Sequence, residues 1–121
     1  MDTPGRQLTK KGEPMSTFVP RLSKESAAVQ GEMFLVLRNK TRLRIIDLLT
    51  RYGGLLCVGE IAEVLEEHAS VISCHLALLR KVKLVSREMQ GTFAYYTLNA
   101  EVLDLYQQFL EQYSLPHGVS L

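Results

Sequence analysis

The sequence of 121 residues predicts a mainly α-helical fold with one small β-hairpin, in the order helix, helix, helix, helix, strand, strand, helix. Apolar residues recur near the helical period in successive stretches before residue 83. Two strand-like runs, 84–89 and 93–98, then flank Gln90-Gly91-Thr92, whose glycine can take the positive φ of a tight turn. The length fits one domain with its own core.

The composition is that of an ordinary globular chain. Hydrophobic residues make up 46% of it and charged residues 22%, which argues against overall disorder. The net charge is only +1, but its distribution is uneven. No Lys or Arg follows Arg87, whereas Glu101, Asp104 and Glu111 do. A basic middle and an acidic end predict two surfaces with different partners.

The cysteines and the chain ends predict the compartment. Cys57 and Cys74 do not make a disulfide framework, so a reducing compartment is expected. The N-terminus has no apolar run behind its charges and no stretch could span a bilayer, so we expect neither a secretory signal nor an anchor. We expect a cytoplasmic protein with a flexible N-terminal tail over 1–21, one folded domain over 22–114 and a C-terminal tail over 115–121.

The first two helices are predicted over 23–38 and 39–51, with Asn39 as the N-cap of the second. Gly53-Gly54 then breaks the chain. The expected core positions are Val29, Met33, Val36 and Leu37 on the first helix and Ile45, Leu48, Leu49 and Tyr52 on the second.

The third helix is predicted over 59–66 and the fourth over 70–81, with Ser70 as the cap of the fourth. The third helix is expected to bury Ile61, Val64 and Leu65. So short a connection between two helices is typical of a helix-turn-helix. The hairpin that follows would then be a wing, and the predicted architecture is a winged helix-turn-helix.

The fourth helix is expected to present two different faces. Ile72, Leu76 and Leu79 have core spacing, and a partly buried flank includes Val71, His75, Leu78 and Val82. The remaining face has small side chains at its start and cations at its end, which suits a major groove. Cations and helix N-termini also favour phosphate oxygens. The expected DNA contacts, from this helix, the wing and the second helix, are Ser70, Ser73, Cys74, His75, Ala77, Arg80, Lys81, Arg87, Gln90, Thr92 and Arg42.

The last helix is predicted to begin after Asn99, a good N-cap, and to run to about Tyr113. Its apolar stripe is wider than a lone small domain needs on a terminal helix. Pairing with a second copy would bury this stripe; packing on the chain's own core is the alternative. The stripe comprises Val102, Leu103, Tyr106, Phe109, Leu110 and Tyr113.

Two other classes of function stay open on spacing alone. The same fold can serve as a protein-interaction module of the anti-repressor type, and the glutamates of the third helix keep that alternative. An enzyme is not expected, because the chain has no Gly-rich phosphate loop, no His-x-x-x-His pair and no nucleophile elbow.

Three motifs in order resemble the ArsR/SmtB family of bacterial regulators. They are LRNKTRLRIIDLL for the second helix, LLCVGEIAEVL for the third, and ASVISCHLALLRKVKLVSREMQGTFAYYTLN for the recognition helix and wing. The resemblance implies a homodimer whose first and last helices, including Met33 and Phe34, pair across a two-fold axis. Its recognition helices would meet an inverted repeat in double-stranded DNA with half-sites ~34 Å apart. We expect a repressor released by a metal, a metalloid or a thiol-reactive signal, or alternatively a regulator without such sensing.

The effector sites of the family are incomplete here. The third-helix site uses C-x-C, but Gly59 follows Cys57 where the second cysteine would stand, and the N-terminal tail has no cysteine. In the last helix Asp104 is present, but the matching histidines are missing and His117 lies beyond the helix. What remains is thiol chemistry at Cys74, or arsenite or a soft divalent metal at Cys57 or Cys74. Alternatively, both cysteines are merely small side chains at their positions.

Overall fold

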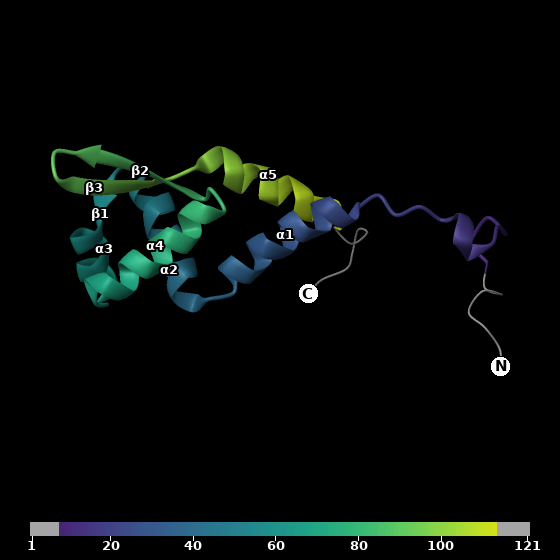
Figure 1. Ribbon diagram of the computed structural model, residues 1–121, viewed down its shortest axis with the longest axis horizontal. Helices are drawn as coiled ribbons and strands as arrows, with labels where there is room; N and C mark the ends of the chain where they lie inside the picture. Colours follow the sequence, from purple (N-terminus) through teal and green to yellow (C-terminus); the bar gives the residue numbers. More distant parts are fainter. Residues whose placement is uncertain (1–7, 114–121) are drawn as a thin grey trace.

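The computed structural model describes residues 8–113 and confirms the winged helix-turn-helix. Its helices and hairpin follow the predicted order, and β1 adds a third strand beside the hairpin (Figure 1). The elements are η2 (Met15–Thr17), α1 (Lys24–Leu37), α2 (Lys40–Tyr52), β1 (Leu56–Cys57), α3 (Val58–Leu65), α4 (Ala69–Lys81), β2 (Val85–Gln90), β3 (Phe93–Leu98) and α5 (Ala100–Glu111).

The sheet is antiparallel, with β3 between β1 and β2. Leu56 of β1 lies opposite Tyr96, and Gln90 of β2 lies opposite Phe93. The wing therefore closes through two residues, Gly91 and Thr92, with Gly91 at φ 63°. The prediction that Gln90 belongs to the turn was wrong, because a two-residue hairpin keeps this residue in the ladder.

Of the three helix caps predicted from the sequence, only that of α2 is made by the expected side chain. Asn39 caps α2, since its Oδ1 accepts hydrogen bonds from the amides of Thr41 and Arg42 at 2.9 and 3.1 Å. Ser70 does not cap α4, because the helix starts one residue earlier and places His68 at the N-cap. Asn99 does stand at the N-cap of α5, but its side chain accepts no capping bond.

The core lies between α2, α3, α4 and the start of the wing. Three expected core positions were wrong: Val29 is 65% exposed, Tyr52 59% and Val64 57%. Val29 and Tyr52 have the helical spacing of the buried stripe but lie beyond the layer that covers it, whereas on α3 Ala62 fills the third buried position instead of Val64. The wholly buried side chains are Ile45, Leu49, Ile61, Ile72, Leu76, Leu79 and Leu84.

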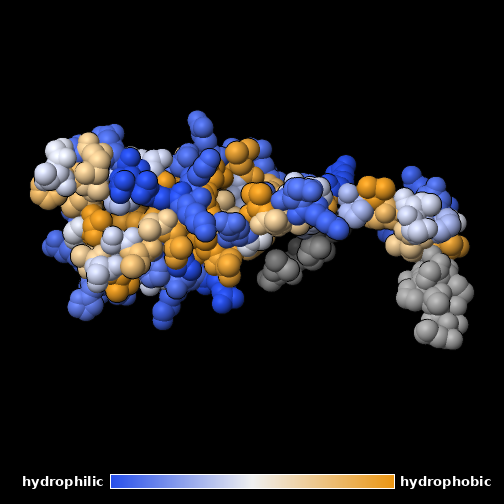
Figure 2. Space-filling model, viewed as in Figure 1, coloured by the Kyte–Doolittle hydropathy of each residue, from blue (hydrophilic) through white to orange (hydrophobic). Residues whose placement is uncertain are grey.

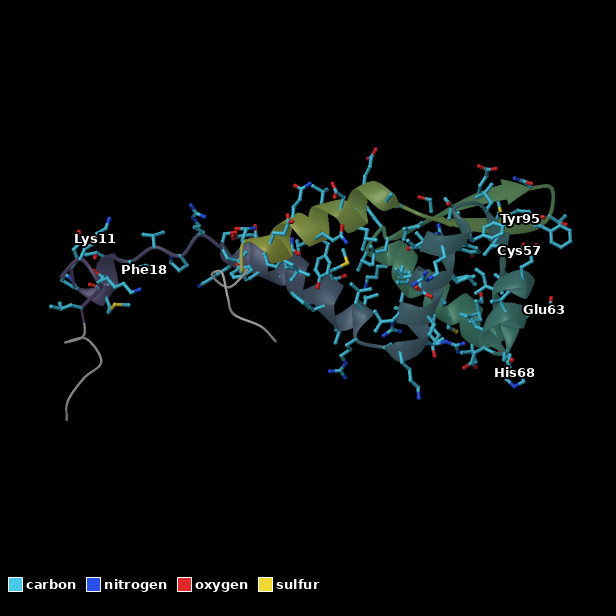
Figure 3. The ribbon with its side chains drawn as sticks, turned by 180° about the vertical axis from the view of Figure 1, so that it is seen from behind. Lys11, Phe18, Cys57, Glu63, His68 and Tyr95 are labelled. Carbon is cyan, nitrogen blue, oxygen red and sulfur yellow. The ribbon has the colours of Figure 1, made fainter. Side chains whose placement is uncertain are left out.

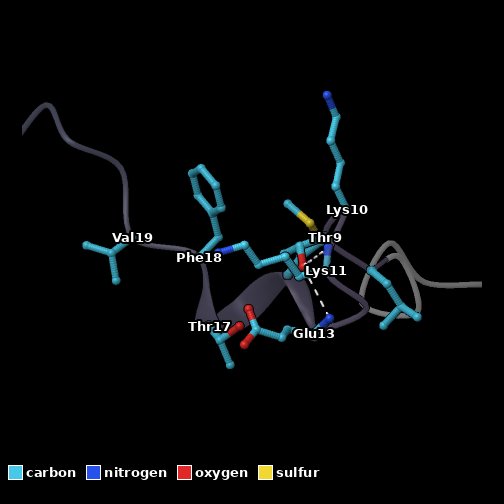
Figure 4. Close-up of a pocket in the computed structure, with 9 residues that line it drawn as sticks. Thr9, Lys10, Lys11, Glu13, Thr17, Phe18 and Val19 are labelled. Atoms are coloured by element: carbon cyan, nitrogen blue, oxygen red, sulfur yellow. Dashed lines mark hydrogen bonds between the residues drawn. The ribbon is translucent and has the colours of Figure 1, made fainter.

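Two parts lie outside this winged body. Helices α1 and α5 run side by side (Figure 1), and the rings of Phe34 and Tyr106 meet edge to face at 5.3 Å between centroids. Residues 8–19, within the predicted N-terminal tail, form a local turn in which Thr9 Oγ1 accepts hydrogen bonds from the amides of Lys11 and Glu13 at 3.2 Å each (Figure 4). No helix among residues 8–113 is long and apolar enough to cross a membrane.

Candidate nucleic-acid interface

The tight turn between α3 and α4 sets the position of the second helix. Glu66 ends α3 in the left-handed region at φ 56°, and the amide of Glu67 donates to the carbonyl of Ala62 at 3.0 Å. These bonds satisfy carbonyls at the end of α3 that the helix itself leaves unpaired. Helix α4 then packs one stripe, Ile72, Leu76 and Leu79, wholly into the core. Its opposite face is thereby fixed toward solvent.

That outward face has the composition expected from the sequence. All six of its predicted contact residues are exposed. Small side chains occupy the first three turns and two cations follow, so the helix can approach a groove closely and still reach phosphates near its end. The six are Ser70, Ser73, Cys74, Ala77, Arg80 and Lys81.

The wing presents its polar side chains on two faces. Arg87, Gln90 and Thr92 are all exposed, but side chains alternate along a strand, so Arg87 and Gln90 lie on opposite faces of β2. Gln90 Nε2 donates to Glu88 Oε2 at 2.9 Å, which turns this amide toward an acidic neighbour. Of the two, Arg87 is therefore the better placed to meet a phosphate.

Two of the expected DNA contacts turn into the protein instead. Arg42 is half-buried; its Nε donates to the carbonyl of Val36 at 2.5 Å and its Nη1 lies 3.1 Å from His75 Nδ1. Burial, followed by the positive charge of Arg42, lowers the pKa of His75, and the carboxylate of Glu67 opposes this shift. A neutral His75 ring can then accept a hydrogen bond from the guanidinium at Nδ1.

The sequence pattern of the bacterial regulatory proteins of the arsR family matches residues 39–87. The chain is also 38% identical over 73 residues to the transcriptional repressor SdpR of Bacillus subtilis (strain 168), which covers 60% of this chain and 79% of that protein. The chain belongs to the arsR family. This arsR-family protein is accordingly a DNA-binding transcriptional regulator.

Other relatives and structures agree. The arsenical resistance operon repressor of Escherichia coli (strain K12) is 37% identical over 71 residues. The match covers 59% of this chain and 60% of that protein, which is less than two thirds of its length. Reduced HlyU from Vibrio cholerae N16961 superposes with a TM-score of 0.59 at 29% identity, covering 76% of this chain and 96% of that one. NolR from Sinorhizobium fredii superposes at 0.61 and 26% identity, with 81% and 100% covered.

The described part of this arsR regulator does not fit a metal centre of the family. Among residues 8–113 no three His, Cys, Asp or Glu side chains gather where they could hold an ion, and Gly59 stands where the second cysteine would be needed. Cys57 lies opposite Tyr95 in the sheet and caps α3 (Figure 3); its amide donates to Glu60 Oε1 at 2.9 Å. Hydrogen bonds from the Cys57 amide and thiol lower the pKa of Glu60. Cys74 is exposed on α4, and His117 lies outside the described residues.

The predicted dimer surface divides by exposure. Hydrophobic side chains reach the surface over α1 and α5 (Figure 2). Phe34, Leu110 and Tyr113 are exposed, whereas Met33 and Tyr106 are already buried within the subunit. Val102, Leu103 and Phe109 are half-buried.

Besides Val29, two further large apolar side chains of these helices are exposed, and the sequence placed neither at the dimer surface. They are Leu35 and Leu105. The helical period offered a signal for Leu105, which stands three residues after Val102 and four before Phe109.

Proposed function

We propose that this regulator is a repressor that binds an inverted-repeat operator as a homodimer, with one α4 in the major groove of each half-site. The exposed, small-sided face of α4 is the observation that carries the proposal. It acts by occupying DNA and not by catalysis, and as a regulator of bacterial genes we expect it to work in the cytoplasm. The exposed apolar side chains of α1 and α5 support pairing of two subunits, since large apolar patches on a monomer mark interaction sites.

The proposed contacts have two roles. Ser70, Ser73, Cys74 and Ala77 face base edges, where hydroxyls donate or accept and small groups allow close approach. Arg80 and Lys81 at the end of α4, with Arg87 and Thr92 on the wing, meet phosphates and fix the register. Gln90 reaches DNA only if the Glu88 face of the wing turns toward it.

A salt titration tests this assignment. Binding of the protein's own upstream duplex should weaken linearly in log–log form as salt rises, because neutralised phosphates release counterions. Arg87→Ala should reduce that slope by about 0.9 and weaken binding to all sequences alike. Ser73→Ala should leave the slope unchanged and alter the preference among base substitutions by about 1–3 kcal/mol. Arg51→Ala is the matched control, because this guanidinium is already paired with Asp47 at 2.7 Å.

The outcome separates the alternatives. If both contact variants keep wild-type slope and preference, the proposed docking of α4 and the wing is wrong. If wild-type binding to duplex is absent and a protein partner binds without salt dependence, the interaction-module alternative replaces the repressor.

We also propose that modification of Cys74 releases DNA, because the thiol is exposed among the proposed base contacts. Added bulk or charge on that sulfur would occupy the space of a base edge. Treatment with peroxide should weaken operator binding of the wild-type protein and of Cys57→Ser, but not of Cys74→Ser. Equal binding before and after treatment in all three proteins would exclude a thiol response at this position.

A further inference from the structure

One guanidinium joins three helices beneath the proposed DNA surface. Arg42 lies in the first turn of α2; Nε bonds to the carbonyl of Val36 in the last turn of α1, and Nη1 bonds to Nδ1 of His75 in the middle of α4. The two partners are six and thirty-three residues away in sequence. All three helices are therefore connected through one side chain.

The chemistry of these bonds fixes the state of each partner. A guanidinium only donates hydrogen bonds, so His75 Nδ1 must carry a lone pair and the ring proton must sit on Nε2. The carbonyl of Val36 belongs to the last turn of α1, where the helix supplies no amide partner. Arg42 thus caps α1 and holds the His75 ring with the same planar group.

We infer that Arg42 and His75 are positioning residues, a pin that fixes the recognition helix α4 relative to α1 and that opens when His75 takes up a proton. This inference rests on the proposed function. Helix α1 belongs to the surface through which two subunits are proposed to pair, so the pin connects that surface to the helix that reads DNA. It thereby fixes the angle and spacing at which two copies of α4 reach their half-sites.

Protonation removes the pin for a simple reason. A proton on Nδ1 takes the lone pair that Arg42 needs and places two positive charges about a hydrogen-bond length apart. The charged groups that act on His75 are Arg42 from α2 and Glu67 from the turn before α4. Burial and Arg42 keep the pKa of His75 below its usual 6.5, with Glu67 opposing, so the pinned state prevails at neutral pH.

Five variants separate a pin from a phosphate contact, and one of them, Arg42→Ala, removes the guanidinium altogether. Arg42→Lys keeps the charge but cannot bond to Val36 and His75 with one planar group. His75→Leu removes the acceptor, while His75→Asn keeps an acceptor close to the position of Nδ1 and does not titrate. Arg38→Lys, at an exposed arginine next to the end of α1, is the matched control.

The readout is the affinity for the upstream duplex divided by that for a scrambled duplex of equal length, across a salt series. Arg42→Lys and His75→Leu should lower this ratio about tenfold at an unchanged salt slope, and His75→Asn and Arg38→Lys should keep it. From pH 7.5 to 5.5 the ratio should fall for wild type and stay level for His75→Asn. A wild-type ratio in Arg42→Lys, together with a slope reduced by about 0.9 in Arg42→Ala, would make Arg42 a phosphate contact and overturn the pin.

A measurement without DNA keeps the pin distinct from the proposed function. Arg42→Lys and His75→Leu each lose the same bond, so each should raise the unfolding equilibrium constant in urea about fivefold, and the double variant should raise it little further. Additive losses would overturn the pin. Wild-type protein that binds no duplex would refute the proposed function, and this cycle would still decide whether the pin exists.

Discussion

The winged body and the pair of helices α1 and α5 differ in how far each completes its own core. The body holds all seven of the wholly buried side chains among residues 8–113, from α2, α3, α4 and the start of the wing. On α1 and α5 no described side chain is buried as deeply, and six large apolar side chains of these helices and the residues just after α5 remain exposed: Val29, Phe34, Leu35, Leu105, Leu110 and Tyr113. The body therefore encloses a core of its own, whereas packing α1 against α5 leaves large apolar side chains exposed. This difference supports the proposed pairing with a second copy, which would cover the exposed side chains of the helix pair.

Removing part of the completed core should have the largest effect. Leu76→Ala empties a wholly buried position in the middle of α4. A substitution of this kind costs about 2–5 kcal/mol, because it loses apolar burial and leaves a cavity. Urea denaturation followed by circular dichroism measures this loss in the free energy of unfolding.

The matched control lies on the exposed side of the same body. Val64→Ala, on α3, should change the free energy of unfolding by no more than about 0.5 kcal/mol. If the two substitutions cost the same, the division of the body into a closed core and an outer face is wrong.

A charge placed on the unfinished half should separate the subunits while leaving each one folded. Leu110→Glu puts a carboxylate among the exposed apolar side chains of α5. Loss of a central apolar contact and burial of a charge should weaken dimerisation by about 2 kcal/mol or more. Sedimentation equilibrium measures the dimer dissociation constant, and operator binding should weaken with it because both half-sites must be held.

The control for this variant adds the same charge elsewhere on the same helix. Gln107→Glu lies at an exposed polar position of α5 and should leave the dimer intact. If the wild-type protein is monomeric at all concentrations, or if the two variants have equal dimer dissociation constants, the exposed apolar side chains of α1 and α5 do not form a dimer interface.

Helical periodicity predicted some buried positions and missed others in both regions, since Tyr52 and Val64 of the body are exposed as well as Val29 of α1. In the body, helical periodicity identified Ile72, Leu76 and Leu79, because one packed layer decides which face of α4 is buried. On α1 the same reasoning failed for Val29, since periodicity gives the spacing of a stripe but not where the neighbouring layer ends. The exposed Leu105 was missed for a related reason: an apolar residue can face a second subunit as well as its own core.

Hydrogen-bond partners were harder to predict than which face of a helix or strand is exposed. The exposure of Ser70, Ser73 and Arg87 follows from the helix and strand periods. The bond between Arg42 and His75 spans thirty-three residues and depends on how α2 crosses α4, which no local pattern encodes. Gln90 was assigned to the same surface as Arg87 because the predicted turn was one residue too long, and one residue reverses the face of a side chain in a strand.

The smallest expected effect concerns the N-cap residues of α2, in the body, and of α5, in the helix pair. Asn39→Ala removes an oxygen that accepts two amide hydrogen bonds at the start of α2, and should cost about 1 kcal/mol of unfolding free energy. Asn99→Ala, at the same position of α5, removes no capping bond and should cost less than about 0.5 kcal/mol. Urea denaturation at one protein concentration, high enough to keep the proposed dimer, measures both. Equal losses would mean that Asn99 caps α5 in solution after all, and that the start of this helix is as firmly fixed as that of the body.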